Sequence, residues 1–204
     1  MRTDLNFYLG SDFNLFLAGD DHRGNAFRYH EGVEMMLGML HQDWNGVKKN
    51  FLVHHGDITE SIFWNDFRYD QDSHAFRDTI FKQVQDVVQE YRKHKKKILL
   101  IMDGNHGNTA RLRPIGNPNI EICNQLQLPF GTYAAVVTYR HNTHVLFRHL
   151  VGHGWGHISS RVKPYKRAKA NQEIQLRAGL EHKASNCMLM SMGHVHRLVT
   201  YSPD

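Results

Sequence analysis

The feature that most constrains the fold of this chain is a set of five short apolar segments, each running into glycine and then into Asp, Asn or His. Apolar segments of this length, bounded by polar loops, predict buried β-strands. A glycine at the end of a strand lets the backbone turn sharply and approach an ion or a phosphate closely. The five segments end at Gly19-Asp20-Asp21-His22, Gly56-Asp57, Gly104-Asn105-His106, Gly152-His153-Gly154 and Gly193-His194-Val195-His196.

Apolar residues at helical spacing separate the first three segments. We expect one helix over residues 31–44 and a second from Phe76 to Tyr91, capped at its start by Asp72 or Ser73. Together with the strands, these helices give a β-α-β-α-β order, which implies right-handed crossovers and a largely parallel sheet. The three strands are expected over Phe13–Ala18, Phe51–His54 and Ile98–Met102.

The second half of the chain has a different pattern. Residues 132–139 and 143–151 predict two strands joined by a short turn, which is a hairpin. A weaker helical pattern covers Glu173–His182, and a last buried strand is expected over Cys187–Met192, with Arg197–Tyr201 as its candidate partner. Because no linker or repeat divides the chain, we expect a single α/β domain over all 204 residues.

Composition excludes several classes of protein. Hydrophobic residues make up 41% of the chain and charged residues 22%, as in globular proteins and unlike disordered or fibrous ones. The longest apolar runs have five residues, whereas a membrane span needs about 18–20. Asp4 and Asp12 interrupt the N-terminal segment, as no secretory signal would allow. Two cysteines, Cys123 and Cys187, are too few for a disulfide scaffold, so we expect a reduced, cytoplasmic protein.

The polar residues after the strands are ligands that first-row divalent metal ions prefer. Imidazole and carboxylate together suit Zn, Mn and Fe, and no thiolate is among them. Residues two apart on an extended segment project to the same side, so the first and last motifs can each direct two ligands at one ion. Seven candidates are too many for one tetrahedral site and suit two ions instead. The seven are Asp20, His22, Asp57, Asn105, His153, His194 and His196.

In residue type and order, these motifs resemble those of the calcineurin-like metallophosphoesterase superfamily. The resemblance covers residues 20 to 196, nearly the whole chain. It implies a four-layer α/β sandwich with two mixed β-sheets flanked by helices and a metal site at the carboxyl ends of the strands. The matching motifs are Asp20-x-His22, Gly56-Asp57, Gly104-Asn105-His106, Gly152-His153 and Gly193-His194-x-His196.

The resemblance also implies a role for each of these residues. His106 would stay off the metals and protonate the leaving oxygen as general acid, a task that suits imidazole near neutral pH. Asp57 would bridge two divalent ions, Mn²⁺ by expectation and Zn²⁺, Fe or Ni²⁺ as alternatives. One ion would be bound by Asp20, His22 and His196. The other would be bound by Asn105, His153 and His194.

Two departures from the family pattern concern residues close to these motifs. Family members usually carry Asp or Glu directly after Gly-Asn-His, where it orients the catalytic histidine, but this chain has Gly107. Asp103 is a candidate substitute. The second motif continues as Ile58-Thr59-Glu60 and lacks the Asp-Arg-Gly of the phosphoprotein phosphatases, so that branch is not expected.

Charge is divided unevenly along the chain. Residues 1–90 carry a net charge of −7 and residues 91–204 a net charge of +12. Basic residues interleaved with an aromatic suit a polynucleotide backbone, although a solvated loop is an equal alternative. Such a segment is Ser160–Lys169, which contains Tyr165 and no acidic residue. Its cations are Arg161, Lys163, Lys166, Arg167 and Lys169.

The expected function is therefore that of a binuclear metal-dependent phosphoesterase, in which a hydroxide bridging the metals attacks phosphorus. The basic second half favours a phosphodiesterase that acts on nucleic acid or nucleotides. A phosphomonoesterase is the alternative within the enzymes. A non-catalytic interaction module on the same fold is a third hypothesis, which retention of His106 and all seven ligands disfavours.

Eleven further histidines lie outside the motifs. One of His54 and His55, which precede the second motif, is expected to pack against the sheet. His157 is expected on the surface near the fourth motif. His149 is among the remainder, for which no functional role is expected.

Overall fold

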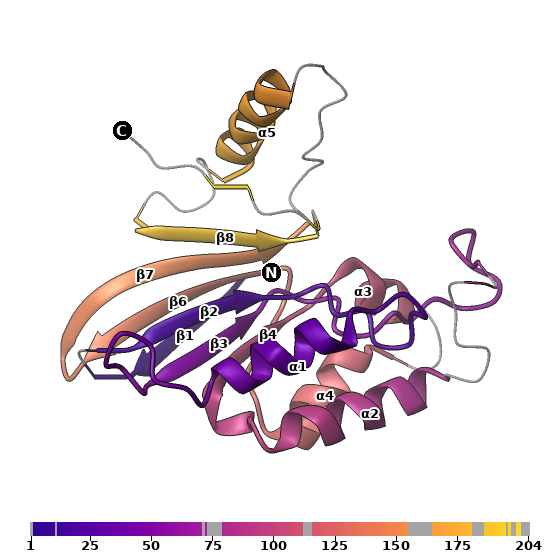
Figure 1. Cartoon of the computed structure of the whole chain (residues 1–204), viewed down its shortest axis with the longest axis horizontal. Helices are drawn as coiled ribbons and strands as arrows, with labels where there is room; N and C mark the ends of the chain where they lie inside the picture. The colour runs from indigo at the N-terminus through magenta and orange to yellow at the C-terminus, as the bar shows by residue number, and fades with distance from the viewer. Residues whose placement is uncertain are drawn as a thin grey trace.

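The computed structural model describes residues 2–10, 12–70, 72, 79–111, 116–154, 165–180, 186–194, 196 and 199–200. It is a mixed α/β structure with two four-stranded sheets (Figure 1). The parallel sheet has the strand order β2-β3-β4-β5, and the mixed sheet has the order β1-β6-β7-β8. Of the two mixed sheets that were expected, one is therefore wholly parallel. The reason is that helices connect each of its strands to the next, which leaves successive strands pointing the same way.

The parallel sheet is formed by the first half of the chain. Its strands are β2 (Asn14–Ala18), β3 (Asn50–His54), β4 (Ile98–Met102) and the short β5 (Phe130–Gly131). The connecting helices are α1 (His30–Met39), α2 (Ile80–Arg92), the 3₁₀ helix η1 (Lys95–Lys97), α3 (Asn105–Arg111) and α4 (Pro118–Leu126). This order confirms the predicted β-α-β-α-β pattern.

The first two helices are shorter than expected. Helix α1 ends at Met39, so Trp44 lies outside it. Asn45 and Gly46 have left-handed φ in a turn that closes a bridge between Trp44 and Val47. The predicted caps of the second helix, Asp72 and Ser73, were wrong, because α2 is capped by the side chain of Thr79. Most of the predicted first turns, residues 73–78, lie outside the described residues.

Helices α3 and α4 and strand β1 were not predicted. The side chain of Asn117 accepts a hydrogen bond from the backbone N–H of Asn119 at 2.9 Å, which caps α4, and Pro118 occupies its first turn. In β1, residues exposed to solvent alternate with partly buried ones, so only every second side chain is directed into the protein.

The mixed sheet is formed by β1 (Arg2–Tyr8), β6 (Ala134–His141), β7 (His144–His153) and β8 (Leu189–Gly193). The predicted hairpin is present as the antiparallel pair β6 and β7, while β1 and β8 pair with it in parallel. The proposed partner strand, Arg197–Tyr201, lies almost wholly outside the described residues.

Helix α5 (Tyr165–Leu180) begins eight residues before the helix that was predicted to start at Glu173. It stands clear of the helices that cover the parallel sheet (Figure 1). Lys166, Arg167 and Lys169 lie on this helix, so their assignment to a loop was wrong. Arg161 and Lys163 lie outside the described residues, as does His157.

A small apolar cluster of Val136 and Leu150, packed against Cys187 and Met190, lies on the outward face of the mixed sheet. Two larger clusters form the rest of the core. One lies between the sheets and includes Val53 and Leu100 of the parallel sheet and Val137 and Val151 of the mixed sheet. The other lies between the parallel sheet and helices α1, α2 and α4, with Tyr91 fully buried in it. Apart from α5, the described elements thus form three layers, which are helices, parallel sheet and mixed sheet. No helix in the described part of the chain is long and apolar enough to cross a membrane.

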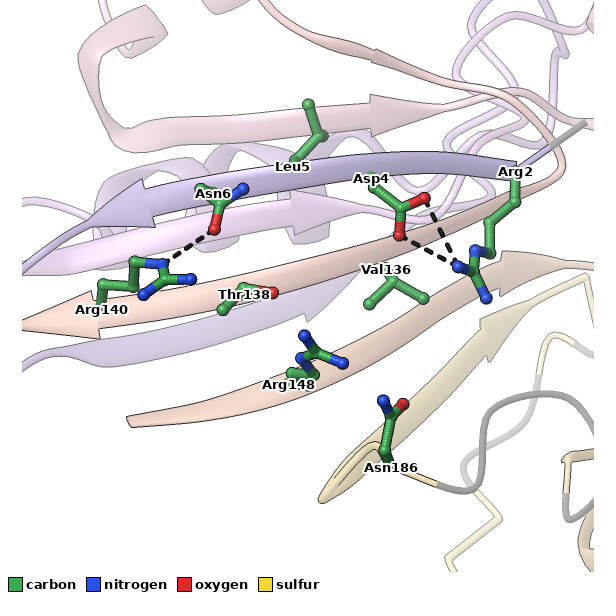
Figure 2. A pocket seen from close by; sticks show the side chains of 9 residues that line it. All are labelled: Arg2, Asp4, Leu5, Asn6, Val136, Thr138, Arg140, Arg148 and Asn186. Carbon is green, nitrogen blue, oxygen red and sulfur yellow. Dashed lines mark hydrogen bonds and ion pairs between the residues drawn. The ribbon is translucent and has the colours of Figure 1, made fainter. Parts of the chain in front are cut away.

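The outward face of the mixed sheet carries a polar groove of about 360 Å³ (Figure 2). Three arginines line it. Arg2 forms an ion pair with Asp4 at 3.4 Å, and Nε of Arg140 donates to the side chain of Asn6 at 2.9 Å. Arg148 lines the same groove. This face is the one that the expected fourth layer of helices would cover, and its charged lining is typical of a surface in contact with water.

Candidate metal centre

The carboxyl ends of five strands meet at one edge of the two sheets. Three groups of side chains at this edge each bring their ligand atoms within 4.8 Å of one another. Two of the groups contain only residues predicted from the motifs. The third contains Glu60, which was not predicted. The first group is Asp20, His22 and His196, the second is Asp57, His153 and His194, and the third is His22, Glu60 and His106.

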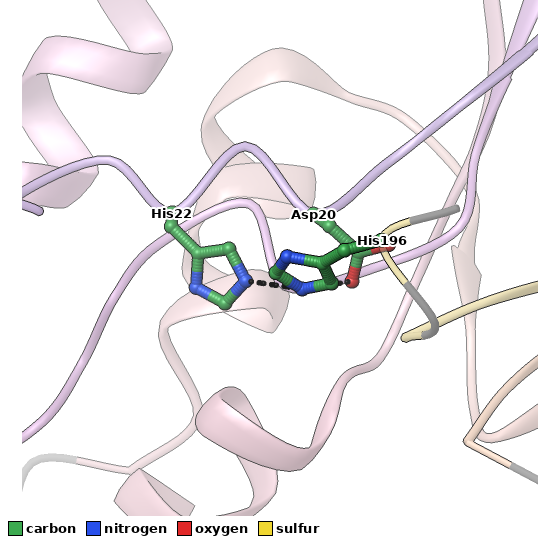
Figure 3. Close-up of side chains that lie close together, drawn as sticks. All are labelled: Asp20, His22 and His196. Atoms are coloured by element: carbon green, nitrogen blue, oxygen red, sulfur yellow. Dashed lines mark hydrogen bonds and ion pairs between the residues drawn. The ribbon is translucent and has the colours of Figure 1, made fainter. Parts of the chain in front are cut away.

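The first group joins the loop after β2 to the segment after β8 (Figure 3). Nε2 of His22 lies 3.3 Å from Nε2 of His196, and the same His196 nitrogen lies 3.7 Å from a carboxylate oxygen of Asp20. The side chain of His196 is 58% exposed, whereas those of His22 and Asp20 are mostly enclosed. The three ligands expected for one ion therefore converge.

The second group lies deeper, and it is centred on His153 at the end of β7. Nε2 of His153 lies 3.0 Å from Oδ2 of Asp57 and 3.0 Å from Oδ1 of Asn105. Nδ1 of His153 donates to the carbonyl oxygen of His55 at 2.7 Å, which leaves Nε2 as the nitrogen available to an ion. His194 completes the group. All four residues expected around the other ion are thus brought together.

Two carboxylates connect the groups. Asp20 belongs to the first group and accepts hydrogen bonds from the backbone N–H of His194, of the second, at 2.9 and 3.1 Å. Asp57 is 1% exposed. Burial would raise its pKa, but the hydrogen bond with His153 and the nearby His106 and His22 lower the pKa to about 2. Asp57 is therefore ionised and interacts with histidines of both groups, as a bridging ligand must.

The backbone at the site adopts conformations that side chains rarely favour. Among the described residues, nine that are not glycine have positive φ, and five of these are proposed ligands. Such conformations cost about 1–3 kcal/mol each and are concentrated at functional sites, where the surrounding structure enforces them. The five are Asp20, His22, Asp57, His194 and His196.

Two of the motif glycines are required by close approach of the loops. A Cβ atom added to Gly56, which has φ +99°, would lie 2.1 Å from the carbonyl oxygen of Asp103. One added to Gly104 would lie 2.0 Å from a carboxylate oxygen of Asp57. Contacts this short involve backbone or a held carboxylate, so only glycine allows these loops to meet.

The suggestion that Asp103 orients His106 was wrong. Asp103 accepts hydrogen bonds from the side chains of Asn117 at 2.9 and 3.0 Å and of Asn119 at 3.2 Å. Its carboxylate therefore binds the N-terminal end of α4. Gly107 packs against the same cluster, since a Cβ added there would lie 2.9 Å from a carboxylate oxygen of Asp103. A family-type acid at position 107 would disrupt this cluster.

His106 is instead held by Glu60. Nδ1 of His106 donates to the backbone carbonyl of Glu60, and the Glu60 carboxylate lies 3.8 Å from the same nitrogen. That carboxylate lies 2.7 Å from Nδ1 of His22. Burial would raise the pKa of Glu60, but its interaction with His22 lowers the pKa, so the group is ionised. Glu60 thus contacts one proposed ligand and the proposed acid.

A buried polar cluster supports the loop that carries Asp20 and His22. Asp21, between them, accepts a hydrogen bond from the hydroxyl of Tyr91 in α2 and lies 3.4 Å from Nε2 of His54. His54 and His55 are both buried. The expectation that one of the two packs against the sheet is therefore confirmed, and it holds for both.

The donor set fits divalent ions of the first transition row. Imidazole nitrogens and carboxylate oxygens converge from both sheets, and the amide oxygen of Asn105 joins them. In the part of the chain that the structure describes, no lysine or arginine forms an ion pair with Asp20 or Asp57. The buried carboxylate of Asp57 is paired with Nε2 of His153 at 3.0 Å. A metal ion bound by these residues would compensate the charge of Asp57 in place of a protonated histidine.

Comparisons with protein-family models and with curated proteins give no match to this chain.

Proposed function

We propose that this chain is a metal-dependent phosphoesterase with two divalent ions at the common edge of its sheets. The observation that carries the proposal is the pair of donor groups that Asp20 and Asp57 connect. One ion would be held by Asp20, His22 and His196. The other would be held by Asn105, His153 and His194, with Asp57 shared between the two.

Mn²⁺ is the ion we propose, with Zn²⁺, Fe and Ni²⁺ as alternatives that the same donors accept. When bound, two such ions neutralise charge on the phosphoryl oxygens and lower the pKa of an attacking water molecule. The chain's own contribution is to position the ligands. Nδ1 of His153 donates to the carbonyl oxygen of His55, and Nδ1 of His22 lies 2.7 Å from the carboxylate of Glu60, so Nε2 of both rings is directed to the ions.

His106 is the residue we propose as general acid. Its Nδ1 is committed to the carbonyl of Glu60, so Nε2 is the atom that would carry the proton to the leaving oxygen. Burial lowers the pKa of His106, although the nearby Asp57 opposes this effect. A lower pKa makes the imidazolium a stronger acid, and such a proton transfer contributes about 10²–10⁴-fold to a reaction rate.

A phosphodiester, with nucleic acid as the class of polymer, is the substrate we propose. The support is that Lys166, Arg167 and Lys169 are exposed on the first turns of α5, although Lys169 also pairs with Glu173 at 3.8 Å. Exposed cations that lie close together on one helix suit the phosphate backbone of a nucleic acid. A phosphomonoester is the alternative substrate, and a non-catalytic module is disfavoured because His106 and its hydrogen bond are retained.

The test is hydrolysis of bis-p-nitrophenyl phosphate and of p-nitrophenyl phosphate by protein loaded with Mn²⁺. A phosphodiesterase hydrolyses the diester faster, and a phosphomonoesterase the monoester. Asp57→Asn serves as the matched negative control. If wild-type protein loaded with Mn²⁺, Zn²⁺, Fe²⁺ or Ni²⁺ hydrolyses neither compound above the level of the control, the proposed activity is wrong.

A further inference from the structure

A chain of four hydrogen bonds crosses the core between the two sheets, beside the metal centre. It begins at Tyr139 of β6, whose hydroxyl lies 3.3 Å from Nδ1 of His149 in β7. Nε2 of His149 and Nε2 of His55 each lie 2.6 Å from the hydroxyl oxygen of Ser191 in β8. His55 directly follows β3, and its Nδ1 lies 3.1 Å from the carbonyl oxygen of Ala18. One serine is thus held between imidazoles that come from different sheets.

The last acceptor determines the direction of every hydrogen bond in this chain when both imidazoles are neutral. The carbonyl oxygen of Ala18 can only accept, so Nδ1 of His55 carries the hydrogen and its Nε2 accepts. Ser191 has a single hydrogen and donates it to His55, so its oxygen accepts from Nε2 of His149. Nδ1 of His149 is then left to accept from the hydroxyl of Tyr139.

Burial supports the neutral state of both rings. His149 is fully buried and His55 is 5% exposed, and among the described residues no carboxylate is a hydrogen-bond partner of either ring. Burial lowers the pKa of His149 to about 3. Each ring nitrogen is then used once, as a donor or as an acceptor, and the serine hydroxyl both donates and accepts.

His55 also touches the segments that carry the proposed metal ligands. A Cβ atom added to Gly19 would lie 2.9 Å from Cβ of His55, and one added to Gly193 would lie 2.8 Å from the same atom. Each of these glycines directly precedes a proposed ligand. The carbonyl oxygen of His55 holds Nδ1 of His153 at 2.7 Å. His55 therefore packs between the segments of both sheets that carry proposed metal ligands.

We propose that Ser191 is a positioning residue, which clamps β8 to the end of β3 and so holds His194 and His196 at the metal centre. β8 is an edge strand of five residues, and β7 is its one partner among the described strands. Ser191 itself is partly buried, but the two histidines that it pairs are buried. A buried donor or acceptor is costly to leave unpaired, so these hydrogen bonds fix the position of β8 relative to the parallel sheet. The proposal rests on the proposed function only in that these ligands bind metal.

The first measurement needs neither metal nor activity. Long-range ¹H–¹⁵N correlation spectra of the metal-free protein report which nitrogen of each neutral imidazole carries hydrogen. We expect the hydrogen on Nε2 of His149 and on Nδ1 of His55. The opposite tautomer at either ring would overturn the clamp, because the serine could not then satisfy both neighbours.

The second measurement compares three variants of β8 in the metal-free protein. Ser191→Ala removes the hydroxyl, Ser191→Thr retains it, and Met190→Ala removes an apolar side chain from the same strand as a control for packing. We expect amide hydrogen exchange in β8, compared with that in β7, to become about tenfold faster in Ser191→Ala, as the loss of a hydrogen bond predicts. Ser191→Thr should restore slow exchange, and Met190→Ala should leave the ratio of β8 to β7 unchanged.

The third measurement is the affinity for Mn²⁺ alone, by titration with electron paramagnetic resonance detection. Changes to residues that orient metal ligands typically cost about 10–100-fold in affinity. We expect a loss of this size in Ser191→Ala and near wild-type affinity in Ser191→Thr and Met190→Ala. Equal affinity of Ser191→Ala and wild type would overturn the positioning role. If the wild type bound none of the candidate metals, the proposed function would fail, while the tautomers and the exchange of β8 would still decide whether the clamp exists.

Discussion

The carboxylate of Glu60 lies 2.7 Å from Nδ1 of His22, and the backbone carbonyl of the same residue accepts from Nδ1 of His106. One residue therefore orients a proposed ligand through its side chain and the proposed acid through its main chain. The two contacts separate experimentally, since a change of side chain removes only the first. In this chain Glu60, and not a residue at position 107, contacts Nδ1 of His106.

Glu60→Gln should weaken metal binding at the ion held by His22, by about 10–100-fold, while His106 keeps its backbone contact. The amide has the shape of the carboxylate but not its charge, so His22 is held less firmly. Competition with a chromogenic chelator measures the affinity of each ion. Glu31→Gln, on exposed Glu31 in the first turn of α1, is the control. Unchanged affinity for both ions would show that Glu60 does not support the centre.

Asp57→Asn should cost most of the bound metal. The side chain is buried and ionised, and the neutral amide removes the charge that would hold two cations together. Metal content per protein, measured by inductively coupled plasma mass spectrometry, checks the prediction. Asp4→Asn is the matched control, because Asp4 is exposed on the outward face of the mixed sheet. Two full equivalents of metal at wild-type affinity would remove Asp57 from the bridging position.

His106→Asn should leave the metal content intact and lower kcat. The amide of Asn can still donate to the carbonyl of Glu60, but it has no atom that carries a proton to the leaving oxygen. The loss should approach about 10²–10⁴-fold for alkyl leaving groups and be much smaller for p-nitrophenyl, which leaves without a proton. Steady-state kinetics on the two substrate types measure both. A loss of equal size for both would contradict the role as acid.

Removal of the α5 cations tests the nucleic-acid substrate. Lys166→Gln, Arg167→Gln and Lys169→Gln together should raise KM for single-stranded DNA or RNA and leave a small diester unaffected. Each phosphate contact adds about 0.7 to the slope of log affinity against log salt, so three lost contacts should flatten it by about 2.

The chain offers a control that removes the same charge elsewhere. Arg92 is the last residue of α2, and Lys93 and Lys96 follow it; all three are exposed. They lie near the start of β4 and thus at the opposite end of the parallel sheet from the metal centre. Their substitution by Gln should leave KM and the salt slope near wild type. If both triple variants behave alike, net charge rather than α5 attracts the polymer.

The stability of metal-free protein should fall as pH decreases from 6.5 towards 4. Native His149 and His55 stay neutral because burial lowers their pKa values to about 3 and about 4, whereas the unfolded chain protonates both near 6.5. The unfolded state thus binds more protons in this range, and each histidine contributes about 1.4 kcal/mol per pH unit.

His149→Gln should remove one of these two contributions, because the amide nitrogen of Gln can replace Nε2 of His149 as donor to Ser191 and does not titrate. Urea denaturation of both proteins at pH 7, 6 and 5 gives the free energy of unfolding. The slope of the variant should be smaller by about 1.4 kcal/mol per pH unit. Equal slopes would mean that His149 titrates normally in the native protein.

Local patterns were sufficient to predict the strands that precede the motifs, because a buried strand ending at glycine differs from its surroundings in both apolarity and turn chemistry. The structure explains why two of these positions are glycine, because a Cβ atom at Gly56 or Gly104 would collide with a neighbouring loop. The convergence of the proposed ligands could be predicted because the carboxyl ends of parallel strands lie at the same edge of a sheet. Strand β1 was missed because only Leu5 and Phe7 on its inward face are strongly apolar.

What could not be predicted depends on contacts between distant segments. Glu60 reaches His22 because Thr59 bridges to Arg23, and nothing in the sequence near Glu60 indicates that pairing. Asp103 is adjacent to Gly104 in sequence, yet Asn117 and Asn119 of a distant helix start engage its carboxylate. Ser191 and His149 carry no motif at all, and only the register of β7 and β8 brings them together.

The contact between His22 and His196 also bears on the order in which the molecule can assemble. The two ring nitrogens lie 3.3 Å apart, although 174 positions separate the residues in the chain. Closing a loop of this length comes late in folding, since local structure forms before distant segments meet. During synthesis the parallel sheet can therefore be complete while the centre still lacks the ligands that follow β8. Capture of metal at full affinity would then report that β8 has docked on β7, so metal uptake would follow the assembly of the described strands.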